Sequence, residues 1–185
     1  MGDHHLILGR VTDYITGETL TDTHDERYRQ KLARLLVDNL GYRKYELKPR
    51  DRITVTAGGK TGNVMVDIKV VTDDKISMIV KYGPGSLTTR HRSTLALARL
   101  VAPYQVALAV ITNGRDADIL DVASGDVISS GLGAMPSRAD LVRRAKNFTY
   151  TPITEKRAEM ESRILYTFEI DGNCFCNLDD NKYSR

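Results

Sequence analysis

Three charged residues interrupt two apolar segments near the middle of the chain. Asp67 and Lys69 lie in the segment NVMVDIKVV, and Lys81 lies near the end of the segment ISMIVKY, which follows a polar turn. A charge within a buried strand costs free energy unless it is paired or used in chemistry. A carboxylate beside two amines could form a metal and phosphate site. The structural alternative is that Asp67 only neutralises Lys69 or Lys81 on a half-buried face.

The segments that carry these residues have the pattern of β-strands. In residues 64–71 apolar side chains alternate with Asp67 and Lys69, so both charged side chains are expected on the same face of one strand. Residues 76–80 are continuously apolar and are expected to form a buried strand. Further strands are expected over residues 42–48, 53–57, 106–112, 117–123 and 127–130.

Helices are expected on both sides of these strands in the sequence. Thr23-His24-Asp25-Glu26 has the form of a capping box, in which the Thr23 hydroxyl and the Glu26 carboxylate each accept a backbone N–H. Apolar residues at helical spacing follow until Gly41, which ends this first helix. Further helices are expected over residues 89–102, 137–148 and 154–168.

Length and composition indicate a single soluble globular domain. The chain has 185 residues, of which 41% are hydrophobic and 28% charged. No apolar run approaches the roughly 20 residues of a membrane span, and the N-terminus has no secretory signal pattern. Cys174 and Cys176 are too few for a disulfide framework, so we expect free thiols and a cytoplasmic protein. We divide the chain into residues 1–22, a main domain over 23–150, and a C-terminal helix and tail over 151–185.

One window of the sequence has basic residues but no acidic ones. Residues 75–115 contain no Asp or Glu, although the whole chain has a formal net charge of only +3. Such a window favours a polyanionic partner. The alternative is that these cations are solvated and are offset by acids elsewhere in the fold. Composition alone does not separate the two interpretations.

Several short motifs together resemble the N-terminal nuclease domain of type I restriction enzyme R subunits, over about residues 25–121. The motifs are Glu26-Arg27-Tyr28-Arg29-Gln30, Leu35-Leu36, Leu40-Gly41-Tyr42, Val66-Asp67-Ile68, the strand that ends near Lys81, and Thr112-Asn113-Gly114. That domain belongs to the PD-(D/E)xK nuclease superfamily. The resemblance implies an α/β, restriction-endonuclease-like core of a helix, a mixed sheet, a second helix and a strand, here with a C-terminal helical extension.

The resemblance also implies a site. In such nucleases an aspartate and an acidic residue of the next strand bind Mg²⁺, which activates water, and a lysine two residues further on stabilises developing charge. Asp67 matches the first acid, Lys81 the lysine, and Glu26 a helix carboxylate that assists. DNA is then the expected partner and Mg²⁺ the expected cofactor. The expected nucleic-acid-binding residues are Arg27, Arg34, Arg90, His91 and Arg92.

The sequence departs from this pattern at the second acid. If Lys81 is the motif lysine, the acid's position holds Ile79; if Lys81 occupies the acid's position, the lysine's position holds Gly83. Neither register has a carboxylate. Two alternatives would restore one. Asp67-Ile68-Lys69 could be the D-x-K motif, with Lys69 as its lysine and Asp51 as the first metal-binding acid, or an acid could come from the turn at Asp73-Asp74.

The sequence therefore leaves two activities open for a nucleic-acid-acting domain. One is a Mg²⁺-dependent DNA endonuclease that uses Asp67, and the other is a catalytically impaired relative that binds DNA. A third interpretation is a structural or protein-interaction module on the same scaffold, since a fold does not determine a function. A homodimer is compatible with each of them.

Overall fold

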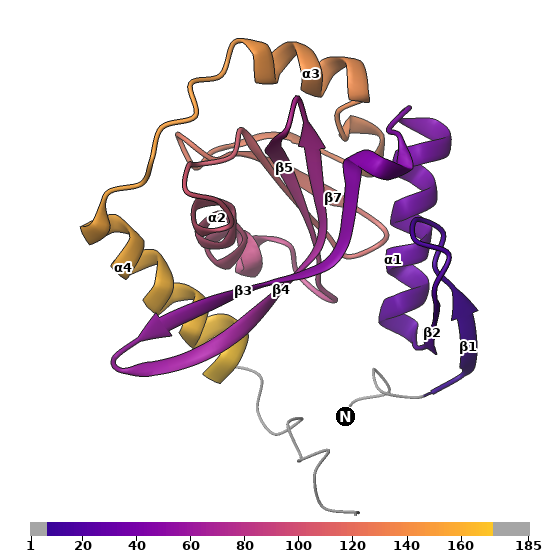
Figure 1. Ribbon diagram of the computed structural model, residues 1–185, viewed down its shortest axis with the longest axis horizontal. Coiled ribbons are helices and arrows are strands. Elements are labelled where there is room, and N and C mark those ends of the chain that lie inside the picture. The colour runs from indigo at the N-terminus through magenta and orange to yellow at the C-terminus, as the bar shows by residue number, and fades with distance from the viewer. Residues whose placement is uncertain (1–6, 172–185) are drawn as a thin grey trace, which may run out of the picture.

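The computed structural model describes residues 7–171, which form a six-stranded sheet with helices on both faces (Figure 1). The sheet has the strand order β3-β4-β5-β6-β7-β8. Its strands are β3 (Leu47–Ala57), β4 (Lys60–Thr72), β5 (Lys75–Tyr82), β6 (Leu108–Thr112), β7 (Ala117–Asp121) and β8 (Val127–Ser130). A separate two-stranded sheet pairs β1 (Gly9–Thr12) with β2 (Thr19–Asp22).

The sheet is mixed, because β5 and β6 are parallel while every other neighbouring pair is antiparallel. The connection between the parallel strands contains α2 (His91–Leu100), as a parallel crossover requires. The predicted α/β class and mixed sheet are confirmed. The more specific restriction-endonuclease-like core stays a prediction.

Four α-helices surround the sheet: α1 (His24–Arg34), α2, α3 (Arg138–Lys146) and α4 (Glu155–Leu165). Short helical segments extend or connect them: η2 (Leu35–Asn39), η3 (Lys44–Glu46), η4 (Thr88–Arg90), η5 (Leu132–Ala134) and η6 (Tyr166–Asp171). The predicted start of the first helix is confirmed, because the Thr23 hydroxyl accepts the backbone N–H of Glu26 at 3.1 Å. Ser137 caps α3 in the same way. The other half of the predicted capping box is not formed, because the Glu26 carboxylate binds side chains instead.

Two apolar clusters stabilise the two faces of the sheet. The first joins α1 to Ile68, Met78 and Val80, and the second joins α2 and α4 to Ile79 and Ile111. Side chains alternate along a strand, so Ile79 and Val80 necessarily contact different helices. The helix α4 is part of the second cluster through Leu165, which is fully buried.

The edge strand β3 differs from the sequence prediction. Two strands separated by residues 49–52 were predicted, whereas Leu47–Ala57 is one strand. Pro49 is tolerated there because an edge strand has an unpaired side on which the missing N–H costs nothing. Arg50 has a left-handed backbone with φ +53, and the pairing with β4 skips Arg50 opposite Asp67. The hairpin is therefore kinked at Asp67, where Val66 packs in the cluster with α2 and Ile68 in the cluster with α1.

The structure describes no helix, within residues 7–171, that is long and apolar enough to cross a membrane. Cys174 and Cys176 lie outside the described residues, so the expectation of free thiols stays a prediction. The same is true of the predicted tail, whose residues 172–185 are not described.

Candidate functional site

Asp67 lies at the kink of β4 with its side chain only 1% exposed. Its Oδ1 accepts a hydrogen bond from Arg29 Nε of α1 at 2.5 Å, and its Oδ2 accepts the backbone N–H of Tyr82 at 2.9 Å. Lys81 Nζ is 4.0 Å from the same Oδ2. Both carboxylate oxygens therefore face donors of the protein itself, two of them cations.

Glu26 continues this arrangement along α1. Its carboxylate accepts hydrogen bonds from Arg29 Nη1 at 3.0 Å and from Gln30 Nε2 at 2.8 Å. Residues three and four positions apart lie on one face of a helix, so the sequence itself brings these three side chains together. Arg29 thus joins Glu26 to Asp67, and the helix to the sheet.

Asp13, in the turn between β1 and β2, is the third buried carboxylate. Its Oδ1 accepts the backbone N–H groups of Ile15 and Thr16 at 2.7 Å each, and its Oδ2 accepts from Gln30 Nε2 at 3.1 Å and from Arg50 Nη1. Burial by itself would raise the pKa of Asp13. The hydrogen bonds from the Thr16 N–H, Arg50, Gln30 and the Ile15 N–H outweigh burial, so the pKa of Asp13 is lowered.

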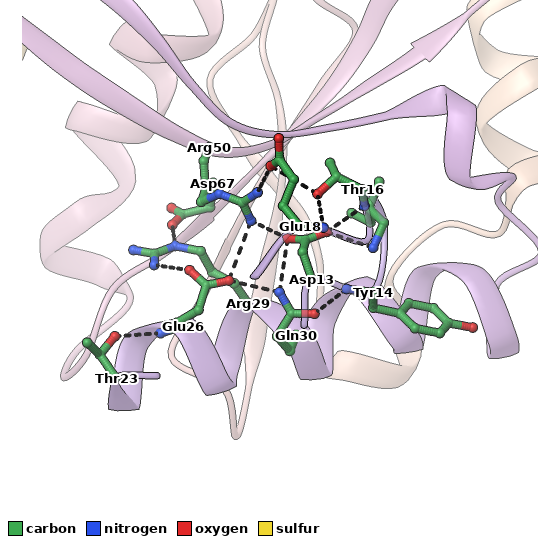
Figure 2. Close-up of polar contacts among 11 residues, drawn as sticks. Asp13, Tyr14, Thr16, Glu18, Thr23, Glu26, Arg29, Gln30, Arg50 and Asp67 are labelled. Carbon is green, nitrogen blue, oxygen red and sulfur yellow. Dashed lines mark hydrogen bonds and ion pairs between the residues drawn. The ribbon is translucent and has the colours of Figure 1, made fainter. Parts of the chain in front are cut away.

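We call this set of side chains the carboxylate network (Figure 2). Its members are Asp13, Glu26, Arg29, Gln30, Arg50 and Asp67. Arg50 connects two of the acids, because its Nη1 also lies 3.5 Å from Glu26 Oε1. Three elements meet here, namely the β1–β2 turn, α1 and the β3–β4 hairpin (Figure 2).

Lys81 lies beside the network at the end of β5. Its ammonium group donates a hydrogen bond to the Met65 carbonyl oxygen at 2.9 Å and lies 3.3 Å from Glu169 Oε2 of η6. A carboxylate thus does approach the lysine that matches the motif. It comes from the C-terminal helical segment and not from the strand where the motif would place it.

The position at which the resemblance would place the second acid holds a residue of the hydrophobic core. Ile79 is fully buried in the cluster with α2, and in the sheet it is paired with Lys69 on β4 and Ala109 on β6. A carboxylate at this position would be surrounded by apolar side chains of α2 and β6. The departure from the motif therefore coincides with a position that contributes to packing.

The acids of the two alternatives have another partner or lie elsewhere along β4. Asp51 is 47% exposed on the edge strand, and its Oδ2 lies 2.6 Å from Lys69 Nζ. The pKa of Asp51 is lowered, first of all by the hydrogen bond from Lys69. The turn residues Asp73 and Asp74 lie at the opposite end of β4, six residues and about 20 Å along the strand from Asp67.

These contacts bear on whether the residues present fit Mg²⁺. This ion requires oxygen ligands in a near-octahedral shell, usually with one or two carboxylates free to coordinate it. The oxygens of Asp67 are instead held by a guanidinium and an amide, with an ammonium close by. Within residues 7–171 no group of three or more His, Cys, Asp or Glu residues is arranged to hold a metal ion. The donor set at Asp67 does not fit the cofactor that the resemblance implies.

The cations predicted on the first helix are engaged in contacts within the chain. Arg27 makes a bidentate contact with Asp22, at 2.8 Å from Nε to Oδ1 and 2.7 Å from Nη2 to Oδ2. The Arg34 guanidinium lies over the Tyr14 ring, 4.3 Å from its centroid. Both side chains remain exposed on the outer surface of α1.

The cations predicted near the second helix lie on the opposite face of the sheet from α1 (Figure 1). His91 contacts Asp118, with 2.7 Å between Nε2 and Oδ2. Arg92 is exposed, and Arg90 packs against Gly83, where an added Cβ would lie 2.7 Å from its side chain. Among the described residues, no ion pair is formed by Arg90 or Arg92.

Sequence reasoning identified Asp67, Glu26 and Lys81 but missed the partners that hold them. The spacing of Glu26, Arg29 and Gln30 was a usable signal, because it places them on one helix face. Asp13, Arg50 and Glu169 had no comparable signal. They reach the site only through the β1–β2 turn, the kink in β3 and the packing of η6.

A family model described as type I restriction enzyme R protein N terminus matches residues 24–136 of the chain. The match begins at α1 and ends just after η5, so it includes Glu26, Asp67 and Lys81. Asp13 and Glu169 lie outside it. No curated protein and no solved structure matches the chain.

Proposed function

The chain belongs to the family of type I restriction enzyme R protein N termini, and from this premise we propose that it binds DNA without cleaving it by a Mg²⁺-dependent mechanism. The observation that carries the proposal is that both oxygens of Asp67 already have donors within the protein. Its two oxygens are held by Arg29 Nε and the Tyr82 N–H, and the position of the second acid holds the buried Ile79.

The absence of cleavage follows from the charges that a metal ion would meet. Two-metal and one-metal phosphodiester hydrolysis both need carboxylates that coordinate the ion and so lower the pKa of its bound water. Here a cation would approach a carboxylate already neutralised by Arg29 and flanked by Lys81. It would have to displace a buried guanidinium, which would then lack its main partner.

The binding half of the proposal rests on cations at one edge of the sheet. Ligands of open α/β sheets bind at the carboxyl ends of the parallel strands, which here are Tyr82 of β5 and Thr112 of β6. The two loops that follow are joined, because Asn113 Nδ2 donates to the Gly85 carbonyl oxygen at 3.1 Å.

Three arginines lie at or near this edge. Arg90 packs on Gly83, Arg92 lies in the first turn of α2, and Arg115 follows the β6 strand as an exposed residue. Within residues 7–171 none of the three forms an ion pair, in contrast to Arg27 on α1. We assign the main phosphate contacts to Arg90, Arg92 and Arg115.

A salt titration of duplex binding tests the binding half. The apparent affinity of the wild type for a short DNA duplex should fall linearly with salt on a double logarithmic plot. Arg92→Gln/Arg115→Gln should reduce the slope by about 2, or about 1 per lost phosphate contact. Arg143→Gln/Arg163→Gln removes the same charge from exposed positions on α3 and α4 and should leave the slope unchanged. Equal slopes in both double variants would refute the assigned surface, and affinity that ignores salt would refute DNA binding.

A plasmid assay tests the absence of cleavage. Supercoiled DNA incubated with the wild-type protein and Mg²⁺ or Mn²⁺ should remain intact. Asp67→Asn, which perturbs the fold less than alanine, is the control for any nicking that is observed. Cleavage by the wild type that is lost in a folded Asp67→Asn variant would overturn this half of the proposal and restore the endonuclease interpretation.

A further inference from the structure

Glu169 places a negative charge on the lysine that matches the nuclease motif. Its Oε2 lies 3.3 Å from Lys81 Nζ, and both side chains are largely buried. Glu169 belongs to η6, which lies outside the part of the chain matched by the family model. The contact therefore joins Lys81, which lies within the matched residues 24–136, to η6, which lies outside them.

The packing of η6 holds Glu169 in this place. Leu165, just before η6, is fully buried in the cluster with α2, and Ile170 lies directly on Gly62 of β4. A Cβ on Gly62 would be 2.3 Å from Ile170 Cδ1, so a larger residue would displace the segment. In Figure 1 the end of α4 runs along the β3–β4 hairpin, consistent with this close contact. Glu169 is therefore positioned by packing on both sides.

The Lys81 ammonium group is shielded from solvent in this arrangement. It is 9% exposed, and its ammonium group is surrounded by the Met65 carbonyl oxygen, Asp67 and Glu169. A DNA phosphate that bound Lys81 would have to replace Glu169, which lies 3.3 Å from the ammonium group. Because like charges repel at short range, phosphate and Glu169 cannot both contact Lys81.

We propose that Glu169 is an internal competitor for the phosphate of bound nucleic acid, and that η6 covers Lys81 until this segment is displaced. The inference rests on the proposed DNA binding and specifies a residue that limits it. In the covered state the surface arginines alone contact DNA. Displacement of η6 adds Lys81 to the contact.

The charge-neutral variant Glu169→Gln tests this competition. It keeps the size of the side chain and removes the repulsion, so binding of a fluorescent duplex should become roughly twofold to fivefold tighter, the range that one ion pair typically supplies. Glu159→Gln is the matched control, because it makes the same charge change on α4 at an exposed position paired with Arg163. It should bind like the wild type.

Two further measurements separate competition from a general change in the fold. In Glu169→Gln/Lys81→Gln the gain in affinity should disappear, because the lysine that phosphate would reach is absent. Hydrogen exchange of backbone amides in residues 165–171 should accelerate when the wild type binds DNA, as η6 leaves β4. This measurement uses only the wild type, so a change in the stability of a variant cannot affect it.

The outcomes distinguish this inference from the proposed function. If the wild type binds DNA and Glu169→Gln binds no more tightly than Glu159→Gln, the competition is refuted and DNA binding stands. If no variant binds DNA, both proposals fall. If the wild type cleaves DNA with Mg²⁺ and Glu169→Gln does not, Glu169 is a replacement for the missing motif acid, and its role as a competitor is refuted.

Discussion

Two clusters of arginines around buried carboxylates lie on opposite faces of the sheet and differ in composition. On the α2 face, Arg99 Nη1 contacts Glu161 Oε1 at 2.8 Å, and its Nε and Nη2 donate to the Val122 carbonyl oxygen at 3.2 and 3.0 Å. Arg157 Nε also reaches Glu161, at 2.6 Å. We call this the α2–α4 joint. It has one acid for two arginines, whereas the carboxylate network has three acids for two.

The α2–α4 joint is a structural contact, whereas the carboxylate network has the excess of acids expected of a functional site. The joint links two helices to the residue after β7, with no positive φ among its residues. The network includes Arg50 in a left-handed backbone, which costs of order 1 kcal/mol or more and is typical of functional sites. Yet its acids are neutralised by the protein's own arginines, as in the joint. The network therefore combines the acids of a site with the contacts of a structural cluster.

The largest effect is expected at the centre of the network. Asp67→Ala removes the carboxylate from a buried guanidinium and an amide, and should destabilise the fold by about 3–5 kcal/mol. Urea unfolding followed by circular dichroism measures the change. The free energy of unfolding of Asp67→Asn should lie between those of the alanine variant and the wild type, because its single carbonyl oxygen can accept from only one of the two donors.

A double variant separates charge from packing in this prediction. Arg29→Met/Asp67→Ala removes both partners, so no unpaired guanidinium remains and part of the stability should return. If the double variant is less stable than the two single losses combined, the ion pair is not the origin of the effect. The contribution of the carboxylate network to stability would then come from packing, as in the rest of the core, and not from its charges.

A smaller effect is expected at the α2–α4 joint. Glu161→Ala should cost about 2–3 kcal/mol, less than Asp67→Ala, because Arg99 keeps its two hydrogen bonds to Val122 and Arg157 can turn to solvent. The same urea titration gives both values under one condition. An equal or larger loss at Glu161 would contradict the ranking of the two clusters.

The smallest effect is expected from pH at Asp13. The pKa of Asp13 is lowered in the folded protein, so the ionised carboxylate stabilises the fold. This contribution is fully present at a pH above the pKa of Asp13 in the unfolded chain. It is lost as the pH falls through the lower pKa of the folded protein. Asp13→Asn removes this titration. The stability gap between wild type and variant should therefore narrow below about pH 4, with a slope of at most about 1.4 kcal/mol per pH unit. A gap that stays constant from pH 7 to acid would show that Asp13 does not titrate in this way.

The predictions from sequence succeeded where the signal is local. The strand containing Asp67, the buried strands β5 and β6, and the capped start of α1 were all expected from alternation, apolar runs and Thr23. The single alternating face predicted for residues 64–71 was wrong, because the strand is kinked at Asp67 and places Val66 and Ile68 in different clusters. The prediction of two strands around Pro49 was wrong, because tolerance of proline depends on β3 being an edge strand. Edge position is a property of the assembled sheet and leaves little trace in a short sequence window.

The candidate site divides in the same way. The sequence by itself determined that Asp67 and Lys81 lie in neighbouring strands and that Glu26, Arg29 and Gln30 share a helix face, because strand and helix periods fix these relations. Only the tertiary structure decided which charges neutralise Asp67 and which acid reaches Lys81. Arg29, Arg50, Asp13 and Glu169 come from segments far apart in the chain, and their meeting depends on the packing of helices on the sheet rather than on any local pattern.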